Sequence, residues 1–161
     1  MEAINNAGLV DKPYPVQDTL FFKIQGDDKA IELASKEIQN ITRKYGSSRF
    51  EFAKTEEEAD NLWQNRKYAL MSTMAAYPGA KCWTTDVCVP VSRLPQLALE
   101  TKRDLKEAGL RSTIVGHVGD GNFHALILFD DDKELESVSA AVHRLVHRAV
   151  AMEGTCKWSL L

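Results

Sequence analysis

The sequence predicts an α+β fold, a ferredoxin-like sandwich in which a mixed or antiparallel sheet carries helices on one face. Strand-like segments alternate with helical ones along the chain, and two of the strands flank the turn at 119–122, which reads Gly-Asp-Gly-Asn. Such a turn joins neighbouring strands into a hairpin, because glycine readily adopts positive φ and Asp or Asn tolerates it. No helix begins after these glycines to receive a phosphate, which argues against a doubly wound nucleotide-binding fold.

Two helices in the first half of the chain are marked by their ends. Gly46 stops the first one, and Thr55 followed by Glu58 forms a capping box that starts the second. Before them lies a polar lead-in segment, residues 1–18, which contains Pro13 and Pro15. The elements predicted here are a strand at 19–25, a helix from 27 or 28 to about 45, a strand at 48–53 and a long helix from 55 to about 77.

Prolines delimit the elements of the second half. Pro90 ends a strand, and Pro95 lies in the first turn of the next helix, where a missing N–H costs little. Three aspartates at 130–132 mark the boundary before the last helix. The elements predicted here are a strand at 85–89, a helix from 92 to about 108, hairpin strands at 111–115 and 125–129, and a helix at 133–153. The whole order is β-α-β-α-β-α-β-β-α.

Composition limits the classes of function. The 161 residues, 44% of them hydrophobic, suffice for one domain with a substantial core. A net charge of -3 and an isoelectric point of about 5.8 give no electrostatic reason to expect a nucleic acid or an anionic membrane as a partner. Three cysteines without metal-ligand or redox spacing predict reduced thiols. No apolar run approaches the ~18 residues of a membrane span, and the first residues resemble neither a signal nor a transit sequence.

The predicted hairpin carries two histidines, His117 and His124, one at each end of its turn. Two imidazoles fixed on a rigid turn could converge on a single metal ion. The other interpretation is that His, Asp and Asn simply suit turns and exposed strand ends, and for the histidine pair taken alone this second interpretation is favoured. His143 and His147 lie four residues apart on the last predicted helix, but arginines adjoin them, so they are assigned to its surface.

Read as a unit, the nonapeptide at 116–124, GHVGDGNFH, resembles the signature of the C-terminal domain of flavin-linked oxidases, a long motif with seven fixed positions. The resemblance covers about residues 19–156. Leu62-Trp63-x-x-Arg66 is similar to the family segment in which an arginine meets the carboxylate of a 2-hydroxy acid, and this implies a substrate-binding role for Arg66. Judged without the resemblance, Arg66 is better explained as a solvated charge on an amphipathic helix. For His117 and His124 the resemblance implies metal binding.

The run at 84–95 looks like the D-lactate dehydrogenase (cytochrome) branch of this family. Hydroxyglutarate-type relatives have a lysine where this chain has Thr85 and a polar residue where it has Leu126. Both differences remove groups suited to a dicarboxylate, so the resemblance implies a small monocarboxylate such as D-lactate. Asp86 is expected to point away from the face of Val87, as a strand-end contact or as part of a site lining, and we favour the structural role.

The end of the chain departs from the family pattern. Relatives continue into T-G-E-H-G, whose glutamate completes the metal ligands and whose histidine is the expected base. Ser159 and Leu160 stand at these two positions, so no catalytic residue is assigned. Residues 157–161 resemble a divergent tail, and the chain resembles a C-terminally truncated fragment whose FAD-binding half lies elsewhere. The isolated chain is therefore expected to be inactive.

The resemblance implies the substrate- and metal-binding domain of a flavin-dependent 2-hydroxy-acid dehydrogenase that oxidises D-lactate to pyruvate. It also implies FAD supplied by a separate N-terminal domain, a divalent metal such as Zn or Mn, an electron acceptor such as cytochrome c, and a mitochondrial location. The alternative is a non-catalytic ferredoxin-like module that binds a partner or a small acid. Neither nucleic acid binding nor a membrane span is expected.

Overall fold

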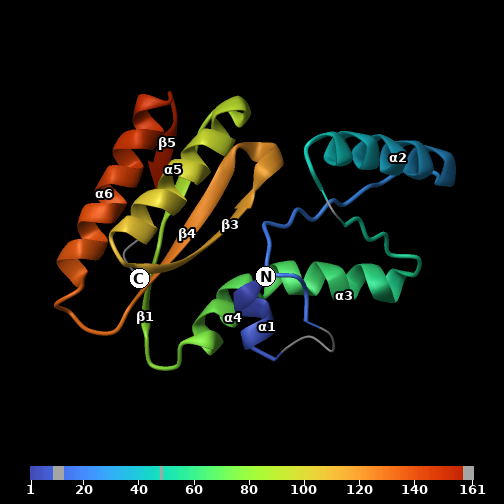
Figure 1. Cartoon of the computed structure of the whole chain (residues 1–161). Helices are drawn as coiled ribbons and strands as arrows, with labels where there is room; N and C mark the ends of the chain where they lie inside the picture. The colour runs from blue at the N-terminus through green and yellow to red at the C-terminus, as the bar shows by residue number, and fades with distance from the viewer. Residues whose placement is uncertain (9–12, 48, 158–161) are drawn as a thin grey trace. The chain divides into compact units, whose positions relative to one another are not determined.

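The computed structural model describes residues 1–8, 13–47 and 49–157, which form two compact units (Figure 1). The first unit consists of Met1 and Pro15–Tyr68. The second combines Glu2–Tyr14 with Ala69–Leu161. The helices are α1 (Glu2–Asn6), α2 (Asp28–Lys44), α3 (Glu56–Lys67), α4 (Ala69–Ala76), α5 (Leu94–Glu107) and α6 (Leu135–Ala151). The strands are β1 (Lys81–Thr84), β2 (Asp86–Cys88), β3 (Arg111–His117), β4 (Asn122–Phe129) and β5 (Thr155–Lys157), and two 3₁₀ turns are η1 (Val91–Arg93) and η2 (Val118–Asp120).

Both helices of the first unit begin where their capping residues predict. The Asp27 side chain accepts a hydrogen bond from the backbone N–H of Ala30, 2.8 Å away, at the start of α2. Thr55 Oγ1 accepts one from the N–H of Glu58, at 3.1 Å, at the start of α3. In each case a side-chain oxygen satisfies a backbone donor that the first helical turn leaves unpaired, which explains why the starts are readable from the sequence.

The strands predicted at 19–25 and 48–53 are wrong as far as the structure describes them. Residues 19–25 and 49–53 have no regular secondary structure, and Ser48 lies outside the described residues. Three of their large apolar side chains remain exposed: Leu20 is 58%, Phe22 51% and Phe52 48% accessible. An alternating pattern favours a strand only where a neighbouring strand accepts its backbone hydrogen bonds, and the described part of this unit offers none.

The helix predicted from 55 to about 77 is interrupted at Tyr68, which leaves the helical conformation with φ -84° and ψ 9°. The interruption coincides with the boundary between the two units. It separates α3, in which no residue is buried, from the more apolar α4, which buries Ala69, Ser72 and Thr73. The sequence contains no glycine or proline at this point, so nothing local predicted the break.

The second unit is a ferredoxin-like sheet with helices. The strands lie in the order β5, β2, β4, β3, with β1 continuing the line of β2 along β4, and every described pairing is antiparallel. The chain path runs from the β1–β2 line through α5 to the β3–β4 hairpin and through α6 to β5. This βαββαβ path confirms the predicted α+β class and its ferredoxin-like character.

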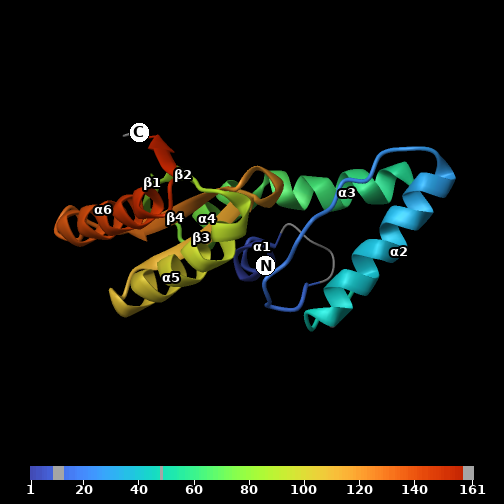
Figure 2. The ribbon, with the colours of Figure 1, turned by 90° about the horizontal axis from the view of Figure 1, so that it is seen from above.

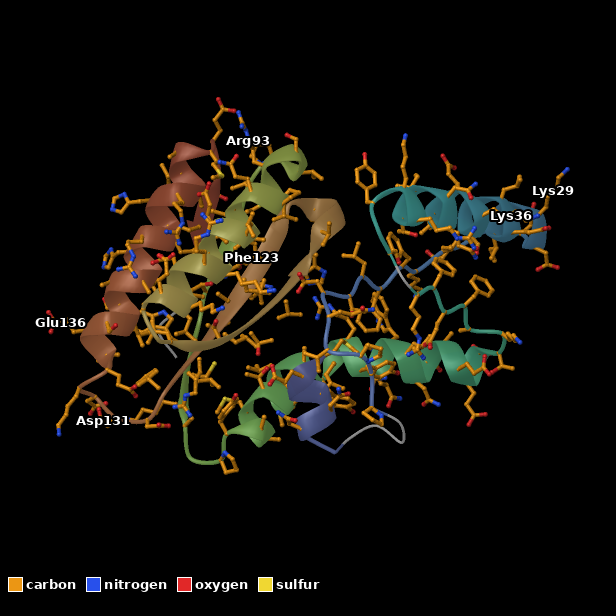
Figure 3. All side chains as sticks on the ribbon, in the orientation of Figure 1. Lys29, Lys36, Arg93, Phe123, Asp131 and Glu136 are labelled. Carbon is orange, nitrogen blue, oxygen red and sulfur yellow. The ribbon has the colours of Figure 1, made fainter. Side chains whose placement is uncertain are left out.

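Helices α5 and α6 lie side by side on one face of this sheet, as Figures 1 and 2 both show. Phe123, labelled in Figure 3, and alternate residues of β4 turn toward these helices and join their apolar side chains in the core. Because strand side chains alternate between faces, Asn122 and His124 lie on the opposite face. The core cluster comprises Val87, Val89, Leu94, Leu97, Leu105, Phe123, Ala125, Ile127, Phe129, Val138, Ala141, Val142, Leu145 and Ala149.

Two short elements were not predicted. Helix α1 forms within the lead-in segment expected to be irregular, and β5 forms from residues expected to be a turn followed by a tail. The strand predicted at 85–89 corresponds to β2, whereas β1, which Thr85 separates from β2, is a further element that was not predicted. Thr85 lies directly beside the predicted histidine site.

Candidate functional site

The predicted β3–β4 hairpin is confirmed, and glycines make its geometry possible. Gly121 ends the η2 turn with φ 69°, in the left-handed region that glycine adopts without strain. A Cβ atom at Gly121 would collide with the carbonyl oxygen of Val89, whose N–H donates to the Gly121 carbonyl at 2.9 Å. At Gly116 a Cβ atom would collide with Asn122 and Phe123 across the hairpin. Both glycines therefore allow a close backbone approach at the ends of the turn.

The hairpin register places His117 and His124 on the sheet face opposite α5 and α6, the face that also carries the buried Leu126 and Leu128. His117 is opposite Asn122, and His124 is opposite Val115, so the two imidazoles are diagonal neighbours. Their ring centroids lie 6.3 Å apart, with ring planes at 89°. His117 is exposed, and the His124 side chain is 28% accessible. The structure thus brings together the two histidines that the sequence singles out.

The separation of the two rings is compatible with a shared metal ion, but the donor set is small. Two zinc–nitrogen bonds of about 2 Å each, together with the ring radii, sum to roughly the observed centroid distance only if the metal lies nearly on the line between the rings, so a tetrahedral site would bring the rings somewhat closer together. Protein zinc sites commonly have three or four protein ligands. Among residues 1–8, 13–47 and 49–157, no group of three or more His, Cys, Asp or Glu side chains is arranged to hold a metal. The histidine pair therefore fits as two ligands of an incomplete set.

Asp86 and Asn122 surround the inner side of His124. Asn122 Nδ2 donates to Asp86 Oδ1 at 2.7 Å and to the carbonyl oxygen of Val87 at 3.0 Å, which ties the start of β4 to β2. Asp86 Oδ1 also lies 3.6 Å from His124 Nδ1. The sequence favours a structural role for Asp86, and the structure shows it both bonded to Asn122 and close to His124. On its other side, the β2–β5 register pairs Asp86 with Lys157, whose positive charge opposes a divalent cation.

Arg66 belongs to the first unit and the two histidines to the second, so its predicted role in binding a carboxylate stays a prediction. It lies in the last turn of α3 and is half-buried, one turn beyond Trp63 on the same helix. Ser159 and Leu160 lie outside the described residues. His143 and His147 are exposed on α6, which covers the opposite face of the sheet, so they cannot share an ion with His117 and His124.

Comparison with known proteins adds a consistent set of similarities. The pattern of the family "FAD linked oxidases, C-terminal domain" matches residues 2–158. A "Probable D-lactate dehydrogenase, mitochondrial" of Danio rerio is 46% identical over 89% of this chain and 29% of its own length. The "D-lactate dehydrogenase [cytochrome], mitochondrial" of Kluyveromyces lactis is 39% identical over 97% of this chain and 28% of its own length. The "D-lactate dehydrogenase [cytochrome] 1, mitochondrial" of Saccharomyces cerevisiae is 40% identical over 96% of this chain and 26% of its own length.

The chain thus spans less than a third of the length of each of these relatives. Within the part of the chain that the structure describes, no helix is long and apolar enough to cross a membrane.

Proposed function

The chain belongs to the family of FAD linked oxidase C-terminal domains, and from this premise we propose that it is the substrate-binding domain of a flavin-dependent D-lactate dehydrogenase. The observation that carries the proposal is that His117 and His124 lie side by side on the sheet face opposite α5 and α6. FAD would be held by a separate flavin-binding domain. The names of the relatives extend the proposal to a cytochrome as electron acceptor and to a mitochondrial location.

The proposed reaction converts D-lactate to pyruvate by removal of a hydride from C2 and a proton from the 2-hydroxyl. Arg66 would hold the substrate carboxylate, because a guanidinium donates two parallel hydrogen bonds to a carboxylate. His117 and His124 would supply two nitrogen ligands to a divalent metal such as Zn or Mn, whose chemistry is Lewis-acid polarisation of the substrate oxygens. FAD supplies the hydride acceptor. We assign no base in this chain, since Ser159 and Leu160 stand where the family motif has glutamate and histidine.

D-Lactate is the proposed substrate rather than a dicarboxylate. Thr85 and Leu126 are both buried, at 5% and 2% accessibility, and neither can donate a charged hydrogen bond to a second carboxylate. The relatives that are 39–46% identical carry the name D-lactate dehydrogenase.

Calorimetric titration of the purified chain with Zn²⁺ or Mn²⁺ tests the metal component of the proposal. We expect weak binding, because two protein ligands leave the ion mostly hydrated, and we expect His117→Ala and His124→Ala each to abolish it. His147→Ala is the matched control, because His147 is an exposed histidine on α6, beyond the opposite face of the sheet. Absence of heat with the unmodified chain, or binding that survives both substitutions, would reject the metal site.

A second candidate is a non-catalytic module that binds a partner protein or a small acid. Its supporting observation is that Ser159 and Leu160 replace the expected glutamate and histidine. Capture of the native protein from its source, followed by measurement of its mass and flavin absorbance, separates the two candidates. A flavoprotein several times larger than 18.0 kDa supports the dehydrogenase, and a flavin-free protein of 18.0 kDa supports the module.

A further inference from the structure

At Thr85, between β1 and β2, a side-chain oxygen replaces a backbone carbonyl as the acceptor of one hydrogen bond of the sheet. The register along β4 continues across Thr85, since Thr84 is opposite Leu126 and Val87 is opposite Phe123. Thr85 is therefore opposite Ala125, where an antiparallel ladder would exchange two backbone N–H···O bonds. Only one of these forms: the Thr85 N–H donates to the Ala125 carbonyl at 3.0 Å.

The second bond is made by a side chain. The N–H of Ala125 donates to the hydroxyl oxygen of Thr85 at 2.9 Å instead of to the Thr85 carbonyl. Both residues are buried, with Thr85 5% and Ala125 0% accessible, so this N–H would otherwise lack a partner. The threonine hydroxyl thus takes over an acceptor role that the backbone normally fills.

The released carbonyl has a specific new partner. Thr85 O lies 3.1 Å from His124 Nδ1. Because a carbonyl oxygen can only accept, Nδ1 must carry the proton in this contact, and the neutral ring then has its lone pair on Nε2. Metal-binding histidines in proteins commonly donate their second ring N–H to a carbonyl or carboxylate in this way, which fixes both tautomer and ring orientation.

A nearby carboxylate supports the same tautomer. Asp86 Oδ1, 3.6 Å from Nδ1, is too distant for a hydrogen bond, but its negative charge favours an N–H over a lone pair at that nitrogen. The Asn122 amide holds this carboxylate in place at 2.7 Å.

We propose that the Thr85 hydroxyl is a positioning group for His124. By accepting the Ala125 N–H, it frees the Thr85 carbonyl to bind Nδ1–H, and so leaves the Nε2 lone pair of His124 available on the same sheet face as His117. The use of that lone pair as a metal ligand rests on the proposed function. The tautomer itself does not depend on it.

The test is the imidazole ¹⁵N spectrum of the full chain at a pH where His124 is neutral. We expect the Nδ1–H tautomer in the unmodified chain and in Thr85→Ser, which keeps the hydroxyl. Thr85→Val has a similar shape but no hydroxyl. In this variant we expect the carbonyl of residue 85 to accept the hydrogen bond from the Ala125 N–H, and His124 to become a mixture of the two neutral tautomers. The signals of His147 are the internal control.

A predominant Nε2–H form in the unmodified chain, or an unchanged Nδ1–H form in folded Thr85→Val, would overturn the proposal. If Thr85→Val does not fold, Thr85→Ala, which also lacks the hydroxyl, takes its place in the comparison, and Nδ1–H in the unmodified chain and in Thr85→Ser is still required.

Zn²⁺ titration of the same variants separates this proposal from the proposed function. If both are right, Thr85→Val weakens Zn²⁺ binding by roughly 10–100-fold, the usual effect of removing a group that orients a ligand, and Thr85→Ser does not. A hydroxyl-dependent tautomer in a chain that binds no Zn²⁺ would reject the metal site and retain the positioning role. Equal Zn²⁺ affinity and an unchanged tautomer in Thr85→Val would reject the positioning role alone.

Discussion

Gly121 is the single residue on which the geometry of the histidine hairpin depends most directly. Its φ of 69° and the approach of the Val89 carbonyl leave no room for a side chain. We expect Gly121→Ala to lower the free energy of unfolding by at least ~1–2 kcal/mol, the usual cost of left-handed backbone in an L-residue, with the collision adding to it. Urea unfolding measures the change.

Gly119 provides the matched control in the same turn. It has an ordinary φ and open space where a Cβ would stand, so Gly119→Ala should change the unfolding free energy by less than ~0.5 kcal/mol. Equal losses in the two variants would mean that any alteration of the turn, and not the conformation of Gly121, determines stability.

At the same scale, the sequence predicted the histidine pair but not the groups around it. His117 and His124 are close in sequence, so recognition of one hairpin sufficed to place them on one face. The contacts of Asn122 with Asp86 and of His124 with Thr85 join residues 36 and 39 positions apart. They depend on the register between β2 and β4, which no local pattern specifies.

At the scale of elements, Asp104 joins the two helices that cover the sheet. Arg144 on α6 donates from Nε to the Asp104 carboxylate at 2.9 Å, and Arg148 Nη2 lies 2.8 Å from its other oxygen. Partial burial alone would raise the pKa of Asp104, but the two guanidinium groups outweigh it and hold the pKa below the usual 3.8. The charged form of Asp104 is therefore more favourable in the folded protein than in the unfolded chain.

This pKa shift predicts how stability depends on pH. A lowered pKa in the folded state contributes stability that is present above about pH 3.8 and is lost as the pH falls through the lower folded value. We expect Asp104→Asn to lower the unfolding free energy by about 1–2 kcal/mol at pH 7, because Arg144 is half exposed and screened by solvent. The difference should vanish in strong acid.

Urea unfolding of Asp104→Asn at several pH values checks this dependence. Glu107→Gln removes an exposed carboxylate from the same helix and serves as the control. A loss that persists unchanged at low pH would show that the asparagine perturbs packing and that the ion pairs are not responsible.

Helices were more predictable than strands because their signals are local. The start of α2 follows from the Asp27 cap and apolar spacing, which act within a few residues. The segments 19–25 and 49–53 have the composition of strands, yet a strand is stabilised by its neighbour, and the described residues supply none. β5, with three residues, is too short to show a period.

Hydrogen exchange tests the irregular state of these segments. Amides at 19–25 and 49–53 should exchange far faster than those of β4, which is paired on both edges and largely buried. Slow exchange in both segments would show that they form a sheet in solution, and that the strand prediction was right for the protein under those conditions.

At the scale of the whole molecule, the groups assigned to substrate binding are divided between two units. Arg66 lies in the first unit and His117 and His124 in the second, and the flavin is assigned to a separate domain. Catalysis by proximity requires these groups to be held in one geometry around the substrate. We therefore expect the 161-residue chain, supplied with FAD, Zn²⁺ and a dye acceptor, to show no D-lactate-dependent dye reduction above a protein-free blank.

The control for this assay is His124→Ala, which removes one of the two proposed metal ligands and should behave like the unmodified chain if neither is active. D-lactate-dependent reduction by the unmodified chain that disappears in His124→Ala would contradict the expectation. It would mean that these 161 residues contain a working centre, including a base to which no residue has been assigned. Because hydride transfer needs the flavin within reach of C2, such activity would also require this chain to bind FAD directly.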